Sequence, residues 1–163
     1  MLEYVLRVRD LVHGTILFTE IEKRIIDHPF FQRLRQIRQN DVAFYVYPSI
    51  NTSRFEHLLG TCRVAGMMAE NLTKGPKWKE YLEKLGEETG IKSQKGFVQL
   101  CRIYALLHDI GHFPLSHLFE RALKEYAISR RPKLNETKLI EYWSGRTAFK
   151  KLHEAFGALL VER

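Results

Sequence analysis

Residues 105–117, with the sequence ALLHDIGHFPLSH, place three histidines and one aspartate directly after an apolar run. Adjacent residues on a helix point about 100° apart, so His108 and Asp109 can approach one ion from two directions. An imidazole nitrogen and a carboxylate together suit divalent Mn, Fe, Co, Ni or Zn, and suit Ca poorly. Two ligands do not complete a site, so the pair predicts a further ligand from elsewhere in the chain.

His57 is the best candidate for that ligand, because Phe55, Leu58 and Leu59 flank it in SRFEHLLG and its face is therefore not plainly solvated. A single histidine is more often a hydrogen-bonded core or surface residue, but that interpretation does not explain the whole group. His112 and His117 could also bind metal, although their offset from His108 favours a place beside the ion. A histidine that titrates near neutral pH can protonate a leaving oxygen or donate a hydrogen bond to phosphate.

Helices must hold these side chains in place, and most of the chain carries a helical period. Thr19 and Glu22 form a capping-box signature that opens a short helix, and Pro29 suits the first turn of a second helix. The predicted helices cover about residues 20–26, 29–37, 54–72, 78–85, 97–108, 114–123 and 149–160. Residues 40–52 break the pattern, and their aromatic residues and valines suit a loop or a small β-ribbon around residues 42–48. The sequence therefore predicts an all-α helical bundle with this ribbon.

The chain has 163 residues, enough for one domain, and its 45% apolar and 28% charged residues are typical of a soluble globular protein. No apolar run reaches the roughly 20 residues of a membrane span, and charges interrupt the N-terminus too early for a signal peptide. Cys62 and Cys101 are expected to be reduced, buried thiols of a cytoplasmic protein. The net charge of +7 favours partners that carry phosphate, such as nucleotides, nucleic acid or lipid head groups, or serves solubility alone.

With His57 followed by the HD pair at 108–109, the chain resembles the HD-domain superfamily of metal-dependent phosphohydrolases. The motifs around these residues make the resemblance specific, and they occur in the order DLVHGTI, IIDHPFFQRLRQIRQ, FYVYP, SRFEHLLGTCRVAGMMAENL, LLHDIGHFPLSHLFE and LHEAFGALLVE. Together they are similar to the deoxynucleoside-triphosphate triphosphohydrolase branch, which includes the bacterial dGTPases and the vertebrate sterile-alpha-motif HD-domain enzyme. We therefore expect a single HD domain over residues 1–163, the N-terminal part of a longer family fold.

The resemblance implies metal binding by His57, His108 and Asp109, catalysis by His112, His117 and Glu120, and substrate binding by Arg54, Gln39 and His153. It implies that a divalent transition metal, or Mg²⁺, polarises the α-phosphate and lowers the pKa of a bound water. Arg54 would offer a bidentate fork to phosphate oxygens, and Gln39 would lie near the sugar or base. A histidine would protonate the departing 5′-oxygen, so the products would be a deoxynucleoside and tripolyphosphate.

One ligand of the family's metal site has no counterpart here, because the family adds an aspartate far downstream of the HD pair. The aspartates of this chain are Asp10, Asp27, Asp41 and Asp109. Three interpretations stay open: a fragment of a longer enzyme, a short HD protein that uses water or a partner chain's carboxylate, and a pseudoenzyme. The apolar face of the last helix, with Phe156, Leu159 and Leu160, favours a homo-oligomer or a covering segment.

Two other functions stay open beside hydrolysis of a deoxynucleoside triphosphate. An HD phosphohydrolase could act on another nucleotide or phosphoester, because the motifs around the metal do not distinguish these substrates. An inactive HD module could instead bind nucleic acid through basic segments such as SRRPK at residues 129–133.

Overall fold

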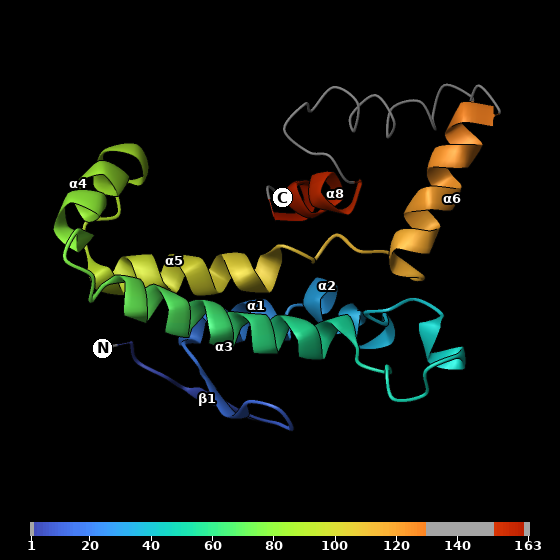
Figure 1. The fold of residues 1–163 in the computed structure, drawn as a ribbon, viewed down its shortest axis with the longest axis horizontal. Coiled ribbons are helices and arrows are strands. Elements are labelled where there is room, and N and C mark those ends of the chain that lie inside the picture. The colour runs from blue at the N-terminus through green and yellow to red at the C-terminus, as the bar shows by residue number, and fades with distance from the viewer. Residues whose placement is uncertain (1, 130–151, 162–163) are drawn as a thin grey trace. The chain divides into compact units, whose positions relative to one another are not determined.

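The structure is a computed structural model that describes residues 2–129 and 152–161 (Figure 1). The chain forms two compact units, each built from two separate stretches of sequence. Unit 1 contains Met1–His28 and Glu56–Leu107, and unit 2 contains Pro29–Phe55 and His108–Arg163. The predicted all-α fold class is confirmed, since the described elements are helices apart from one two-stranded sheet. None of these helices has the length and apolar character that crossing a bilayer requires.

The ribbon of unit 1 pairs β1 (Leu6–Asp10) with β2 (Gly14–Phe18) in antiparallel register. Asp10 shapes the turn between the strands, because its Oδ1 accepts hydrogen bonds from the backbone N–H groups of Val12 (2.9 Å) and His13 (2.6 Å). The first residue of β2 is a glycine with a φ of +71°, a backbone conformation that glycine adopts without steric cost.

Helix α1 (Glu20–Asp27) begins at the predicted capping box, which the structure confirms through reciprocal hydrogen bonds between Thr19 and Glu22. The Glu22 carboxylate is fully buried and also accepts hydrogen bonds from Arg102 of α5 (Gln94–Leu107). The Arg102 Nε and Nη2 atoms donate to it at 2.6 Å and 2.8 Å. This buried ion pair fastens α1 to α5 within unit 1.

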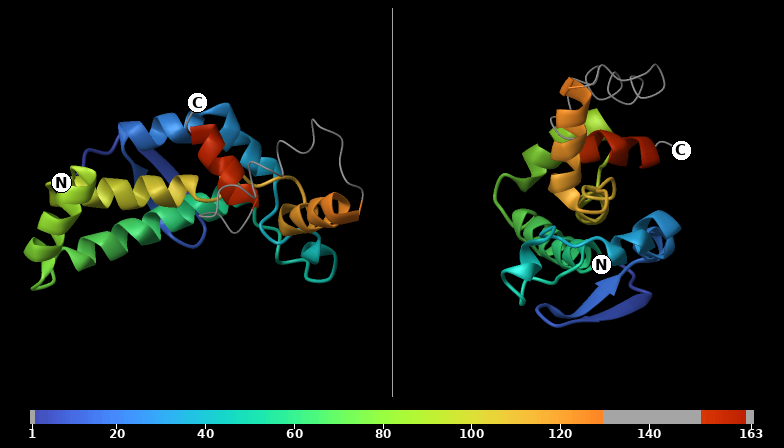
Figure 2. Two further views of the ribbon diagram at one scale, coloured as in Figure 1. Left: turned by 90° about the horizontal axis from the view of Figure 1, so that it is seen from above. Right: turned by 90° about the vertical axis from the view of Figure 1, so that its right-hand side faces the viewer.

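The long helix α3 (Arg54–Leu72) lies beside α5 in both Figure 1 and Figure 2, and the Gly66 backbone meets the Arg102 side chain. Helix α4 (Trp78–Thr89) extends beyond its predicted end at about residue 85. It is followed by Gly90, whose φ of +75° places it in the left-handed conformation common after helices.

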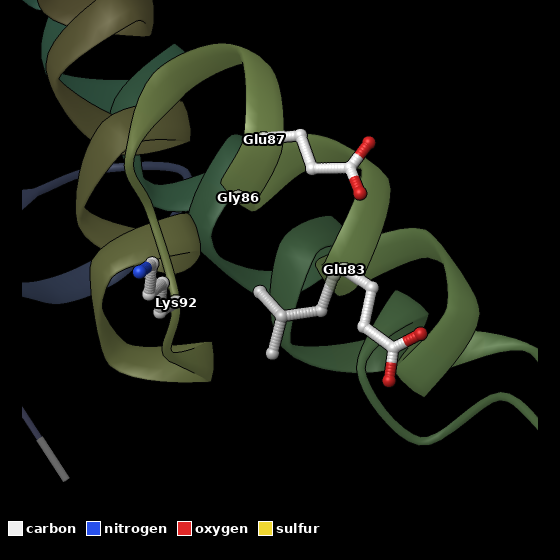
Figure 3. A pocket seen from close by; sticks show the side chains of 5 residues that line it. Glu83, Gly86, Glu87 and Lys92 are labelled. Carbon is white, nitrogen blue, oxygen red and sulfur yellow. The ribbon is translucent and has the colours of Figure 1, made fainter.

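A pocket of unit 1 lies at the end of α4, and Figure 3 shows the side chains around it. The residues that line it are Leu82, Glu83, Gly86, Glu87 and Lys92. This lining contains none of the histidines or aspartates predicted to do chemistry, so the candidate site lies elsewhere.

Unit 2 begins with α2 (Pro29–Gln32), which tightens into a 3-10 helix at Arg33–Gln36. The predicted helix start at Pro29 is confirmed. The sequence places Phe30, Leu34 and Ile37 on one apolar face; Leu34 and Ile37 are buried, but Phe30 is exposed, because the helix changes its winding after Gln32.

The ribbon predicted around residues 42–48 is wrong in its position, because a turn of 3-10 helix at Ala43–Tyr45 lies there instead. The Tyr45 N–H donates to the carbonyl of Val42 at 3.1 Å, a spacing of three residues. The aromatic residues that suggested a strand pack in another way, and the Arg38 guanidinium lies 4.1 Å from the centre of the Phe44 ring. The ribbon forms at residues 6–18, where a tight turn joins two stretches of equal length.

Helix α6 (Ser116–Ser129) begins two residues after its predicted start at Pro114. The delay has a local cause, because Leu115 has a φ of +62° and the chain therefore leaves the right-handed helical region just before α6. Residues 130–133 of the basic SRRPK segment lie outside the described residues.

Helix α8 (Leu152–Val161) lies beside residues 108–115 of the same unit, as the two views of Figure 2 show. A Cβ atom placed on Gly111 would collide with the backbone of His153 and Gly157. The close approach of α8 therefore requires a glycine at this position. The first residues of the predicted last helix, from residue 149, lie outside the described residues.

Candidate functional site

The HD pair follows directly after α5, and Asp109 is its buried member. The Asp109 Oδ2 accepts a hydrogen bond from Arg54 Nη1 at 2.5 Å, and its Oδ1 lies 3.5 Å from His108 Nε2. Burial acts to raise the pKa of Asp109, but the hydrogen bond from His112 and the charges of His108 and Arg54 outweigh it. The net result is a pKa well below the usual range, so the carboxylate is ionised at neutral pH.

His112 lies deeper than either residue of the pair, with 1% of its surface exposed. Its Nε2 is 3.5 Å from Asp109 Oδ1, and its Nδ1 has no hydrogen-bond partner among the described residues. Burial lowers the pKa of His112 to about 4, with the charges of Arg54 and His153 acting in the same direction. The imidazole is therefore neutral at pH 7, and a buried nitrogen without a partner is a polar atom that a bound group could satisfy.

Three imidazoles from two helices and their preceding loop gather in unit 2. Ring nitrogens of His112, His117 and His153 lie within 4.8 Å of one another. His153 of α8 stacks on His112 with ring centres 3.7 Å apart, whereas His117 meets both rings edge-on. His112 and His153 are buried and the side chain of His117 is 55% exposed, so His117 is the member of the cluster that solvent can reach.

Glu120 of α6 connects the two outer histidines of this cluster. Its Oε1 accepts hydrogen bonds at 2.6 Å from the His153 backbone N–H and at 2.6 Å from His153 Nδ1. Its Oε2 lies 3.5 Å from His117 Nδ1. Burial acts to raise the pKa of Glu120, but the hydrogen bonds from His153 outweigh it and lower the pKa to about 2. Because an ionised carboxylate only accepts hydrogen bonds, His153 Nδ1 is the donor in this contact.

Most of the predicted site residues of unit 2 do come together. Arg54, Asp109, His112, His117, Glu120 and His153 are linked by the contacts above. Gln39 is half-buried in the same unit, and its Oε1 has no hydrogen-bond partner among the described residues. His57 belongs to unit 1, on α3, where its spacing of three residues from Arg54 places both on one face of the helix.

Two residues that support the site were not predicted from the sequence. Arg33 Nη1 donates to the carbonyl oxygen of His112 at 2.6 Å, and its Nη2 donates to the carbonyl of Ile110. Ser116 Oγ accepts a hydrogen bond from Arg54 Nε at 2.8 Å. The RLRQIRQ motif contains several arginines, and nothing in it distinguishes Arg33 from the others. Nothing around the serine of PLSH indicates a partner 62 residues away.

The donor set fits a divalent transition ion. An imidazole and a carboxylate are adjacent in His108 and Asp109, and the carboxylate is already ionised at neutral pH. His112 adds an imidazole whose Nε2 lies close to Asp109 and whose buried Nδ1 has no hydrogen-bond partner among the described residues. Nitrogen and oxygen donors of this kind bind Mn, Fe, Co, Ni or Zn, so residues of unit 2 alone supply part of a metal site.

Comparisons with known proteins agree with this chemistry. A model of the HD domain family matches residues 54–163. The chain is 32% identical over 161 residues to the human deoxynucleoside triphosphate triphosphohydrolase SAMHD1, a match that covers 95% of this chain and 23% of that protein. The cattle SAMHD1 is 34% identical over 113 residues, which cover 69% of this chain and 17% of that protein.

An archaeal relative extends the comparison. An uncharacterized protein of Methanocaldococcus jannaschii is 37% identical over 132 residues, which cover 81% of this chain and 24% of that protein. The chain thus spans about a quarter or less of the length of these curated relatives. The family match covers well over half of the chain and includes Arg54, His57, the HD pair and the histidine cluster. The chain therefore belongs to the HD-domain family, in the branch that contains these triphosphohydrolases.

Proposed function

We propose that the chain is a metal-dependent phosphohydrolase that cleaves deoxynucleoside triphosphates to a deoxynucleoside and tripolyphosphate. The observation that carries the proposal is the buried arrangement in which an ionised Asp109 adjoins His108, His112 and Arg54. The similarity to SAMHD1 proteins over most of the chain supports the choice of substrate. A homo-oligomer and a cytoplasmic location remain predictions from the sequence.

The proposed metal ligands are His57, His108 and Asp109. His57 stands one helical turn after Arg54 on α3, and Arg54 is bonded to Asp109, so the register of α3 supports His57 as the third ligand. When bound, a divalent ion would polarise the α-phosphate and offset the charge that develops on it. Arg54 would keep the carboxylate of Asp109 oriented and ionised whether or not the ion is present.

The histidine cluster has two proposed tasks beside the phosphates. His117 is exposed, so it can donate a proton to the departing 5′-oxygen at the surface of the cluster. His153 donates from Nδ1 to Glu120, which fixes the orientation of its ring, and its Nε2 would contact water or substrate. His112 is neutral at pH 7 and supplies a nitrogen close to Asp109 without adding a charge.

The substrate contacts are proposed for Gln39 and Arg54. The buried Oε1 of Gln39 has no partner among the described residues and suits a hydroxyl or amino group of the sugar or base. Arg54 is almost fully buried and donates to Asp109 and Ser116, so a phosphate contact would involve its remaining nitrogen. The net charge of +7 adds a general attraction for a polyanionic substrate.

The proposal is tested by incubating the chain with Mn²⁺ and each of the four deoxynucleoside triphosphates, and by identifying the phosphate product. We expect equal amounts of deoxynucleoside and tripolyphosphate, and no turnover by the His108→Ala variant. Tyr104→Ala is a matched control on α5, because Tyr104 is exposed and near the HD pair in sequence. Release of orthophosphate or pyrophosphate would instead favour an HD phosphohydrolase of another specificity.

A further inference from the structure

Two consecutive residues with side chains, Leu115 and Ser116, have positive φ angles where α6 begins. Leu115 has a φ of +62° and Ser116 has a φ of +43°. This region is disfavoured for residues with a Cβ atom, and such residues gather at functional sites where surrounding contacts hold them. The strained pair lies between His112 and His117, in the middle of the candidate site.

The residues with positive φ place the hydroxyl of Ser116 in the interior of unit 2. Ser116 is fully buried, and its Oγ makes two hydrogen bonds within unit 2. It accepts from Arg54 Nε at 2.8 Å and donates to the carbonyl oxygen of Arg38 at 3.0 Å. Arg38 in turn pairs with Ser53 through a β-bridge, so the hydroxyl is fixed to the backbone that leads into α3.

The hydroxyl determines where the guanidinium of Arg54 points. A guanidinium is planar and rigid, so a bond at Nε sets the direction of the two outer nitrogens. The Nη1 of Arg54 donates to Asp109 Oδ2 at 2.5 Å. Three successive hydrogen bonds therefore connect the Arg38 carbonyl oxygen, through Ser116 and Arg54, to the carboxylate of Asp109.

We propose that Ser116 is a positioning residue for Asp109, acting through Arg54. This role rests on the proposed function, in which Asp109 is a metal ligand. The Ser116 hydroxyl holds the Arg54 fork on Oδ2 of Asp109, so that Oδ1 would be the oxygen available to a bound divalent ion. Loss of residues that orient metal ligands typically weakens metal affinity about 10–100-fold.

The test measures the dissociation constant of Mn²⁺ at pH 7.5 from the electron paramagnetic resonance signal of the free ion. We expect Ser116→Ala to weaken Mn²⁺ binding about 10-fold. Ser116→Gly also removes the hydroxyl, but glycine adopts a positive φ without strain. The variant therefore distinguishes loss of the hydroxyl from a change in backbone strain, and it should weaken Mn²⁺ binding as much as Ser116→Ala does. Leu115→Gly relieves strain and keeps the hydroxyl, so Mn²⁺ affinity should be unchanged.

A matched control and a double variant separate positioning from folding. Ser93→Ala removes a hydroxyl that accepts a hydrogen bond from Gly96 N–H at 3.1 Å in unit 1, and it should leave Mn²⁺ affinity unchanged. Arg54→Lys abolishes the fork, so adding Ser116→Ala to it should cause no further loss. Urea unfolding of each variant shows whether a change in affinity follows stability.

The outcomes distinguish this inference from the proposed function. If the unaltered chain binds Mn²⁺, His108→Ala abolishes binding and Ser116→Ala leaves it unchanged, the positioning role is wrong while the metal site stands. Affinity that falls in Ser116→Ala and returns in Ser116→Gly would also contradict the role, because backbone strain and not the hydroxyl would be responsible. If His108→Ala binds Mn²⁺ as the unaltered chain does, the proposed metal site and this role both fail.

Discussion

Replacing Glu120 by glutamine removes one negative charge from the histidine cluster and keeps the shape of the side chain. The carboxylate is buried, and two donors of His153 reach its Oε1 at 2.6 Å. The amide oxygen of glutamine can still accept a hydrogen bond, but it carries no negative charge. Hydrogen bonds to an ionised acceptor are stronger than hydrogen bonds to a neutral one. We therefore expect Glu120→Gln to lower the free energy of unfolding at neutral pH, and to do so by an amount that depends on pH.

The magnitude follows from the pKa of the group. The pKa of Glu120 is lowered from 4.5 to about 2. A difference of about 2.5 units corresponds to about 3 kcal/mol of stability. Because the unfolded chain binds the proton more readily, this stability is complete well above pH 4.5 and is lost as the pH falls toward 2. At pH 3 about 1 kcal/mol of it should remain, so the unaltered chain and Glu120→Gln should differ less at pH 3 than at pH 7.

Urea unfolding monitored by circular dichroism at pH 7, 5, 4 and 3 measures this difference. The two proteins should differ by about 3 kcal/mol at pH 7 and converge as the pH falls below about 4.5. Glu125→Gln is a matched control, because Glu125 is exposed on the same helix and pairs with Arg121 at the surface. A constant difference between Glu120→Gln and the unaltered chain from pH 7 to pH 3 would refute the reasoning, since the depressed pKa would then contribute nothing to stability.

Three further perturbations have expected outcomes. Arg102→Met leaves the fully buried Glu22 carboxylate without its charged partner and should cost about 3–5 kcal/mol in urea unfolding, whereas Arg121→Met at the surface should cost less than about 1 kcal/mol. His112 has a pKa lowered to about 4, so the metal-free protein should lose stability as the pH falls from about 6.5 to 4, and His112→Gln should remove that part of the loss. Gly111→Ala places a Cβ against the backbone of His153 and should lower the free energy of unfolding by about 1–3 kcal/mol. An unchanged free energy of unfolding would contradict this close contact.

The parts of the fold that depend on neighbouring residues could be predicted from the sequence. The Thr19–Glu22 capping box is one such part, because both hydrogen bonds form within four residues. The start of a helix at Pro29 is another, since proline sets its own φ. The misplaced ribbon shows the limit of this approach, because the aromatic residues at 42–48 resemble a strand, whereas a strand needs a partner that sequence periodicity does not reveal.

The candidate site divides in the same way. The HD pair and the histidines were predicted as a group, and the structure brings His112, His117 and His153 together. The hydrogen-bond partners of each side chain could not be predicted from the sequence, because they lie far apart along it. Glu120, for example, accepts a hydrogen bond from His153, which is 33 residues away. The phosphate contact of Arg54 stays a prediction, and its bonds to Asp109 and Ser116 could not be predicted because tertiary packing alone brings these residues together.

The proposed reaction of this chain breaks the bond between the 5′-oxygen and the α-phosphorus of a deoxynucleoside triphosphate. It is tested most directly by running the reaction with Mn²⁺ in water enriched in oxygen-18 and by measuring the mass of both products. Attack of water on the α-phosphorus predicts one labelled oxygen in tripolyphosphate and none in the deoxynucleoside, with no product from Asp109→Asn. Label in the deoxynucleoside, a product other than tripolyphosphate, or undiminished turnover by Asp109→Asn would show that the proposed reaction is wrong.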